Sequence, residues 1–327
     1  MRYYLRKLGF YLIATWIAIT LNFLLPRLVK GNPVDVILAK TQSSGPMPPE
    51  ARHALELQFG LSHDPLIVQY VHYLGNLFTG NFGLSVSNYP TPAIDVVAQA
   101  IPWTLVLVGL STVISYIIGV VFGSWLGWKR GSWTDGLLPV STFISAIPYF
   151  WLALVLVYVF GLTLHWFPVA GGYDLNIVPA FTPEFIGSAV YYGVLPAFTI
   201  VLASVSGQLL STRNMMVSTM AEDYVTTARA KGLRQRRVFG SYAMRNALLP
   251  SVAGFAMSLG FIVNGSVVTE TVFSYPGVGF TLLQAVQNND YPLMQAVFLV
   301  ITLAVLGANL LVDIVYGFID PRTRLAN

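Results

Sequence analysis

The sequence predicts an all-α polytopic membrane protein with six transmembrane helices and a large loop after the first. Three observations lead to this fold class. Only 10% of the 327 residues are charged and 55% are hydrophobic, whereas soluble domains carry about 25% charged residues. Six segments have the roughly 20 apolar residues that a helix needs to cross a bilayer. The basic residues are concentrated in loops on one side of these segments.

None of the six predicted spans contains a charged residue. Each is expected to be a helix, because backbone groups in lipid need partners within their own segment. The first is interpreted as a retained helix rather than a signal peptide, since no small-residue cleavage site follows it. The spans cover Gly9–Leu25, Thr104–Trp128, Leu137–Leu164, Tyr192–Ser211, Leu248–Thr269 and Met294–Val312.

The distribution of Lys and Arg predicts which side of the membrane each loop occupies. With the N-terminus in the cytoplasm, the predicted outer loops hold four of the 18 basic residues, namely Arg27, Lys30, Lys40 and Arg52. The other fourteen lie on the inner side, as the positive-inside rule requires. Both termini are therefore expected in the cytoplasm. Because the basic residues flank apolar spans, no nucleic-acid partner is expected.

The spans divide the chain into four parts. Residues 1–30 form a cytoplasmic tip and the first helix, and residues 31–103 form an extracytoplasmic region with short helices. Residues 104–318 form a five-helix core that includes a polar loop at 221–250, and residues 319–327 form a cytoplasmic tail. Within the outer region we expect helices at 51–60 and 65–78 and turns at 80–89. The segment 93–101 is expected to be an interfacial helix that leads into the second span.

Several chemistries have no support in the sequence. The chain has no cysteine, which excludes disulfides and thiol catalysis. It has no Gly-Lys dipeptide, and therefore no Walker A loop for ATP. Its four histidines are scattered over predicted outer loops without metal-binding spacing. The spans also lack the ionisable groups that mark intramembrane enzymes and proton-driven pumps. No catalytic, cofactor-binding or metal-binding residue is predicted.

Uncharged polar residues in the spans have two interpretations. They form hydrogen bonds between packed helices, or they line a wetted translocation path. An unsatisfied amide in lipid is costly, so Gln208 and Asn264 are the stronger path candidates. At the outer side, Tyr149, Glu270 and Phe273 are further candidates, and Glu270 is either an outer gate or a solvated helix end.

The polar segment 222–250 is the most informative part of the chain. Residues 221–231 are predicted to form a helix, with Tyr224, Thr227 and Ala228 on one small face. Glu222 and Asp223 suit its positive end, and Gly232 followed by Leu233 is a typical helix stop. A short capped helix of this kind can enter a groove on another protein. The basic residues that follow it have a simpler explanation in membrane topology alone.

This segment resembles the EAA loop of binding-protein-dependent ABC importer permeases. The match covers residues 223–233 and the run from Arg245 and Asn246 to Pro250. Further matches lie along the whole chain, at residues 31–33, 59–61, 80–83, 102–105, 270–279 and 320–322. Together they are similar to the B-type permease subunit of the dipeptide, oligopeptide and nickel importers. Two positions depart from the general loop pattern, because Thr226 stands where Glu is usual and Arg245 stands where Pro is usual. Both changes are typical of the peptide branch.

The resemblance implies a type I importer fold in a prokaryotic inner membrane. It implies a second homologous permease subunit, two ABC ATPase subunits that bind ATP and Mg, and an extracytoplasmic substrate-binding protein. This chain would be a non-catalytic subunit. The coupling residues carried over are Glu222, Asp223, Tyr224, Thr227, Ala228, Ala230, Lys231, Gly232, Leu233, Arg245, Asn246 and Pro250.

The substrate is less determined than the machinery. Peptides are the family default, while some members of this branch import oligosaccharides and others import nickel. Aromatic residues such as Tyr149, Phe150 and Trp151 would stack on sugar rings, but aromatic residues also gather at membrane interfaces. A stand-alone channel or carrier is a remote alternative, which the polar loop disfavours.

Overall fold

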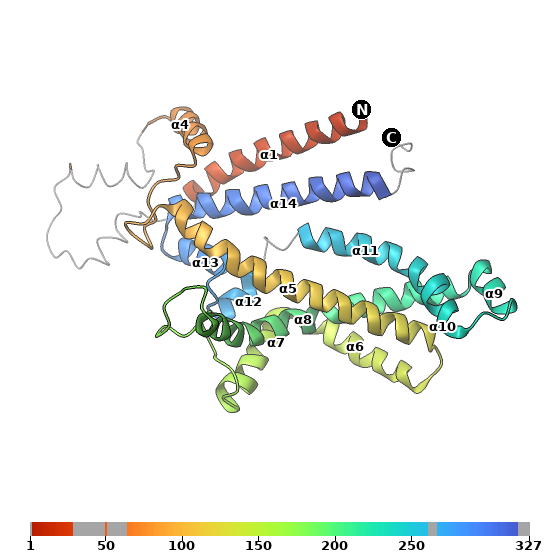
Figure 1. Cartoon of the computed structure of the whole chain (residues 1–327). Coiled ribbons are helices and arrows are strands. Elements are labelled where there is room, and N and C mark those ends of the chain that lie inside the picture. Colours follow the sequence, from red (N-terminus) through yellow and green to blue (C-terminus); the bar gives the residue numbers. More distant parts are fainter. Residues whose placement is uncertain (1, 29–49, 51–63, 261–266, 320–327) are drawn as a thin grey trace. The chain divides into compact units, whose positions relative to one another are not determined.

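The computed structural model describes residues 2–28, 50, 64–260 and 267–319. Helices dominate these residues, and the pairing between Leu84 and Pro92 is an isolated bridge. The α-helices of the first half are α1 (Arg2–Leu28), α4 (Leu66–Thr79), α5 (Ala93–Trp128), α6 (Leu137–Ala146) and α7 (Tyr149–Leu156) (Figure 1). Those of the second half are α8 (Pro183–Met220), α9 (Asp223–Ala230), α10 (Gln235–Arg237), α11 (Arg245–Gly260), α12 (Val267–Val272), α13 (Val278–Gln287) and α14 (Tyr291–Ile319). There is also a 3₁₀ turn, η1 (Trp133–Gly136), and there are π-helical turns η2 (Val157–Thr163) and η3 (Val238–Met244).

The chain forms two compact units. The first contains residues 1–104, 263–267 and 276–327, and the second contains residues 105–262 and 268–275. Helix α5 begins in the first unit and continues in the second.

In the first unit, α1 and α14 run side by side (Figure 1). The amide of Asn22 joins them by donating to the carbonyl of Gln295 at 2.8 Å. The core of this unit combines small residues at the start of α5 with apolar residues of α13 and α14. It includes Ala93, Val97, Ala100, Val278, Ala285, Leu293, Met294, Ala296 and Val297.

In the second unit, α5 and α8 approach closely along a row of glycines. A methyl group placed on Gly119, Gly123 or Gly127 would lie 2.5–2.7 Å from atoms of α8. Since such distances are clashes, only glycine permits this packing. At 36 and 38 residues, these helices extend about 55 Å, well beyond the roughly 30 Å hydrocarbon layer.

The prediction of membrane-spanning helices is confirmed for four described helices, or five when one bent pair counts as a single span. The third predicted span is not continuous. It bends by 97° between α6 and α7, where Ile147 and Pro148 are extended, with ψ of 126° and 131°. Proline disfavours a helical residue before it. The fifth predicted span includes residues 261–266, which lie outside the described residues.

The outer region also differs from the sequence prediction. The segment 93–101 is not a separate interfacial helix, because α5 continues through Pro102. Its apolar residues Ala93 and Val97 are buried against α13 and α14 rather than available to lipid. The predicted helix at 65–78 is confirmed as α4. The predicted helix at 51–60 lies outside the described residues.

Candidate functional site

The loop after α8 folds as a short helix with a glycine stop, as the sequence predicts. Helix α9 covers Asp223–Ala230, with Glu222 before it in extended conformation. Gly232 follows at φ +72°, a backbone angle that glycine adopts without steric cost. Its N–H donates to the carbonyl of Arg229 at 2.9 Å, and the Leu233 N–H donates to Ala228 at 3.3 Å. This pair of bonds is a Schellman motif, which closes the free end of the helix.

One face of α9 is packed against its own chain. Val225 and Ala228 are buried with Val238, and Leu233 and Tyr242 pack against this cluster. The sequence placed Ala228 on an exposed docking face together with Tyr224 and Thr227, and that placement is wrong. Ala228 is 3% exposed, whereas Tyr224 is 40% exposed and Thr227 is also exposed.

Trp128, the last residue of α5, is the residue on which the loop packs, and it is called the base of the loop below. Its ring packs against the α9 cluster and also against the cluster of Met216, Ala243 and Ala247. The ring of Phe239 meets it edge-on at 5.3 Å. Sequence reasoning missed this role, although the position of Trp128 directly before Lys129 and Arg130 marks it as the end of a span.

Arg229 is turned back toward the body of the second unit. Its guanidinium lies 5.3 Å from the centre of the Trp128 ring, which is a cation–π distance. It also lies 3.3 Å from the sulfur of Met220. The flank of α9 that carries Arg229 is therefore directed at its own chain. The opposite flank, with Tyr224, Thr227 and Lys231, is exposed and available for another molecule.

The second half of the loop leads back into the core through η3 and α11. Arg245 and Asn246 are exposed, and the Asn246 amide donates to the carbonyl of Tyr242 at 2.8 Å. Ala247 is buried at the base described above. Of the remaining coupling candidates, Glu222, Asp223 and Ala230 are exposed on α9 or its cap, and Pro250 lies within α11.

Gln208 lies at the contact between α5 and α8. Its side chain fills the space left open by Gly119, and its amide is 3.4 Å from the hydroxyl of Thr212. Thr212 is in turn 3.4 Å from the hydroxyl of Ser251 on α11. These contacts favour the helix-packing interpretation of Gln208 over a wetted path. Asn264 lies outside the described residues.

The other path candidates gather around α12. The hydroxyl of Thr269 donates to that of Tyr149, so α12 is joined to the start of α7. Glu270 is completely buried, and the expectation of a solvated helix end is therefore wrong. Phe273 is also buried, and its carbonyl accepts from the Gly171 N–H at 2.8 Å. Burial, followed by the nearby charge of Glu270, raises the pKa of Tyr275 in the turn after α12.

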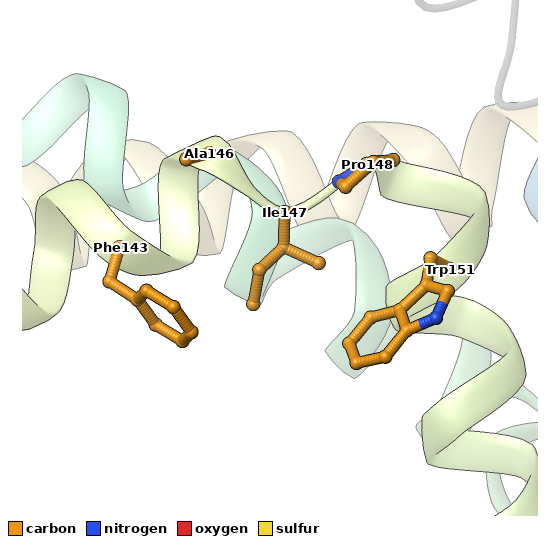
Figure 2. A pocket seen from close by; sticks show the side chains of 5 residues that line it. All are labelled: Phe143, Ala146, Ile147, Pro148 and Trp151. Atoms are coloured by element: carbon orange, nitrogen blue, oxygen red, sulfur yellow. The ribbon is translucent and has the colours of Figure 1, made fainter.

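The bend between α6 and α7 leaves an apolar hollow of about 430 Å³, shown in Figure 2. It is lined by Phe143, Ala146, Ile147, Pro148 and Trp151. The rings of Phe143 and Trp151 are exposed by 70% and 51%. Since a site for a polar ligand needs some convergent polar groups, this lining does not by itself form a binding site for a peptide or a sugar.

Comparison with known proteins identifies the family. The profile of the "Binding-protein-dependent transport system inner membrane component" matches residues 119–325. The chain belongs to this family. It is 36% identical over 336 residues to the di/tripeptide transport system permease protein DppB of Pseudomonas aeruginosa, which covers 98% of this chain and 97% of that protein.

Two further relatives are similar over most of their length. The oligopeptide transport system permease protein AppB of Bacillus subtilis is 33% identical over 303 residues, with 92% of each chain covered. A probable peptide ABC transporter permease protein of Sinorhizobium fredii is 34% identical over 304 residues, again with 92% of each covered. The family and the apolar helices together show a multi-pass membrane protein.

Proposed function

We propose that this chain is the permease subunit of an ATP-driven importer that takes up dipeptides or oligopeptides. The names of all three relatives refer to peptide transport. The resemblance of the polar loop to the EAA loop supports the same assignment. The sequence has no Gly-Lys dipeptide, so the energy of ATP would have to come from separate ATPase subunits. The chain itself would be non-catalytic.

The observation that carries this proposal is the exposed flank of α9. A short polar helix with one buried and one free face is suited to insert into a groove of a partner in water. Tyr224, Thr227 and Lys231 would contact an ATPase subunit. Val225 and Ala228 would instead hold the helix to the body of the permease. Movement of the partner would then move the permease helices that contact α9.

The packing of the second unit offers a route for that movement. The base of α9 rests on Trp128 of α5 and Met216 of α8. These two helices are locked together by the glycine row, and α8 is joined to α11 through Thr212 and Ser251. A displacement at α9 would therefore move the ends of three helices together, which is the kind of rigid-body motion that alternating access requires.

The assembly follows from the same proposal. Two ATPase subunits would dock on the cytoplasmic side, one of them on this chain, and a second homologous permease would complete the path. An extracytoplasmic binding protein would deliver the peptide. The excess of Lys and Arg on the α9 side supports cytoplasmic termini in a prokaryotic inner membrane.

A matched pair of neighbouring threonines tests the docking flank. Thr226 and Thr227 are both exposed, but Thr226 is on the Arg229 side of α9 and Thr227 is on the Tyr224 side. In the reconstituted importer, Thr227→Trp is expected to reduce substrate-stimulated ATP hydrolysis at least about tenfold, since a steric clash at a docked helix easily exceeds 1.4 kcal/mol. Thr226→Trp is expected to retain it. Equal stimulation in both variants would contradict the proposal.

A further inference from the structure

Helix α4 is fixed to the last nine residues of α1, 20–28, by three polar contacts. The hydroxyls of Thr20 and Tyr70 are 2.7 Å apart. The Asn22 amide donates to the Tyr73 hydroxyl at 3.1 Å. Arg27 donates to the side-chain oxygen of Gln69 through Nε and Nη2, at 3.2 and 2.9 Å.

Aromatic packing completes this attachment. The ring of Phe23 meets the rings of Tyr70 and Tyr73 at 5.1 and 5.5 Å. Figure 1 shows α4 beside the end of α1 that is far from the N-terminus. All of these residues belong to the first unit. The position of α4 on α1 is therefore defined by direct contacts.

These contacts place α4 at the depth of a membrane boundary. The apolar segment Arg6–Leu24 of α1 is long and apolar enough to span a membrane, and Arg27 lies three residues after it. A guanidinium at the end of a span is held at the level of the lipid headgroups. Because Arg27 bonds to Gln69 and Asn22 bonds to Tyr73, α4 lies against the part of α1 that is in one leaflet and its headgroup region.

The rest of the surface of α4 has an apolar side and a more polar side, on which Val68 is also exposed by 40%. Ile67, Val71 and Phe78 are exposed by 78%, 62% and 87%. Their spacing of four and seven residues puts them on one face of the helix. His72 and Asn76 are also exposed, but they lie on the neighbouring side. The helix contains no Asp, Glu, Lys or Arg.

We propose that α4 is an interfacial helix whose exposed apolar face, formed by Ile67, Val71 and Phe78, binds the acyl chains of the membrane. His72 and Asn76 would then face the headgroups and water. In water the apolar face would be a costly surface, because three large side chains would stay hydrated. At the boundary of a bilayer the same arrangement of apolar and polar sides is stabilising.

Continuity with α1 supports lipid as the occupant. On α1, the residues beside those that hold α4 form an exposed apolar stripe, with Leu21, Leu24 and Leu28 exposed by 52%, 40% and 77%. This stripe belongs to the span and its end, and lipid covers such a surface. The apolar face of α4 begins where α1 leaves the membrane. The two surfaces together make one lipid-facing region.

The absence of cysteine from the chain allows a direct test by spin labelling. Single substitutions Ile67→Cys, Val71→Cys, Phe78→Cys and, as the matched control, His72→Cys would be labelled with a nitroxide. The full chain would be placed in vesicles of phosphatidylethanolamine and phosphatidylglycerol. Collision rates of each label with oxygen, which concentrates in lipid, and with a water-soluble nickel chelate would be measured.

The expected result is a high oxygen rate and a low nickel rate at positions 67, 71 and 78, and the reverse at position 72. The ratio of the two rates should differ between the two groups on the order of tenfold, given how poorly polar reagents enter lipid. Nickel rates at 67, 71 and 78 equal to that at 72 would overturn the proposal, because the face would be in water. Low rates for both reagents would also overturn it, because protein would cover the face. The measurement needs no transport activity, so its outcome is independent of the proposed function.

Discussion

Helices α4 and α9 end in the same way, but they bury opposite kinds of side chain. Each is closed by a glycine in the left-handed region, Gly80 at φ +70° and Gly232 at φ +72°. Each has the two backbone bonds of a Schellman motif. However, α9 is held by apolar residues and exposes polar ones, whereas α4 is held largely by hydrogen bonds and exposes apolar ones.

The medium around each helix decides which of its sides is buried. A helix that projects into water gains stability by burying Val225 and Ala228 and leaving Thr227 and Lys231 outside. A helix at a bilayer boundary gains more by satisfying Tyr73 against its own chain, because a polar group in lipid is costly. The same local motif can therefore serve a protein partner in one place and lipid in another.

Removal of the Trp128 ring is expected to have the largest effect. Trp128→Ala would leave a cavity under both clusters of the loop, and such changes cost about 3–5 kcal/mol. The α9 loop should become sensitive to protease although its own sequence is intact. Trp125→Ala, one turn earlier, is the control. Equal protease resistance of the loop in both variants would show that Trp128 is not its base.

Matched substitutions of the two glycines that end α9 and α4 give a second test. Gly232→Pro cannot reach φ +72° and removes the N–H that bonds to Arg229, at a cost of about 3 kcal/mol or more. Uptake and substrate-stimulated ATP hydrolysis should fall, while the amount of protein in the membrane is unchanged. Gly80→Pro damages the same motif on α4, and the ATP hydrolysis of the assembled importer should still respond to substrate. If ATP hydrolysis no longer responded to substrate in either variant, the proposed difference in role between α9 and α4 would be contradicted.

Charge on the two exposed sides of α4 should have unequal effects. Val71→Lys would place an ammonium in lipid, at a cost of about 1–3 kcal/mol near a boundary. His72→Lys would place it in water at little cost. Thermal unfolding in lipid vesicles measures the difference. If both variants unfold at the same temperature, the apolar side of α4 is not in lipid.

The smallest expected effect concerns the hydroxyl of Tyr73. Burial raises the pKa of this group to about 12, above the value of about 10 in an unfolded chain. The neutral hydroxyl therefore stabilises the fold fully below pH 10, and this contribution is lost as the pH rises from 10 toward 12. The Tyr73→Phe variant should be about 1 kcal/mol less stable to unfolding at neutral pH. Its stability should depend less on pH between 10 and 12 than that of the parent protein. If the stabilities of the variant and the parent protein fell equally between pH 10 and 12, this prediction would be contradicted.

The sequence alone was sufficient for the general architecture and for the limits of α9. Long apolar runs predict spans whatever their neighbours are, and Gly232 followed by Leu233 predicts a helix stop through local backbone chemistry. The face of α9 was predicted less well. The residue Ala228 is equally compatible with a docking face and an inner face, and the choice depends on Trp128, which lies a hundred residues away in the sequence.

Other errors have the same origin in tertiary contacts. The apolar stripe at Ala93 and Val97 resembled an interfacial helix, but α13 and α14 cover it. The predicted span 137–164 contains Pro148, and the residue before this proline is driven to an extended conformation. Glu270 was expected to be either an outer gate or a solvated helix end, and its complete burial excludes the second of these.

Cysteine labelling can measure directly whether the exposed flank of α9 is covered by an ATPase subunit. Because the chain lacks cysteine, Thr227→Cys and Thr226→Cys each provide a single thiol at exposed positions about 100° apart around one helix. Their rates of reaction with a water-soluble maleimide would be compared in the free permease and in the assembled importer. We predict that assembly slows labelling at position 227 at least about tenfold, as for a residue in a protein interface, and leaves position 226 nearly unchanged. An unchanged labelling rate at position 227 would show that no ATPase subunit covers this flank of α9.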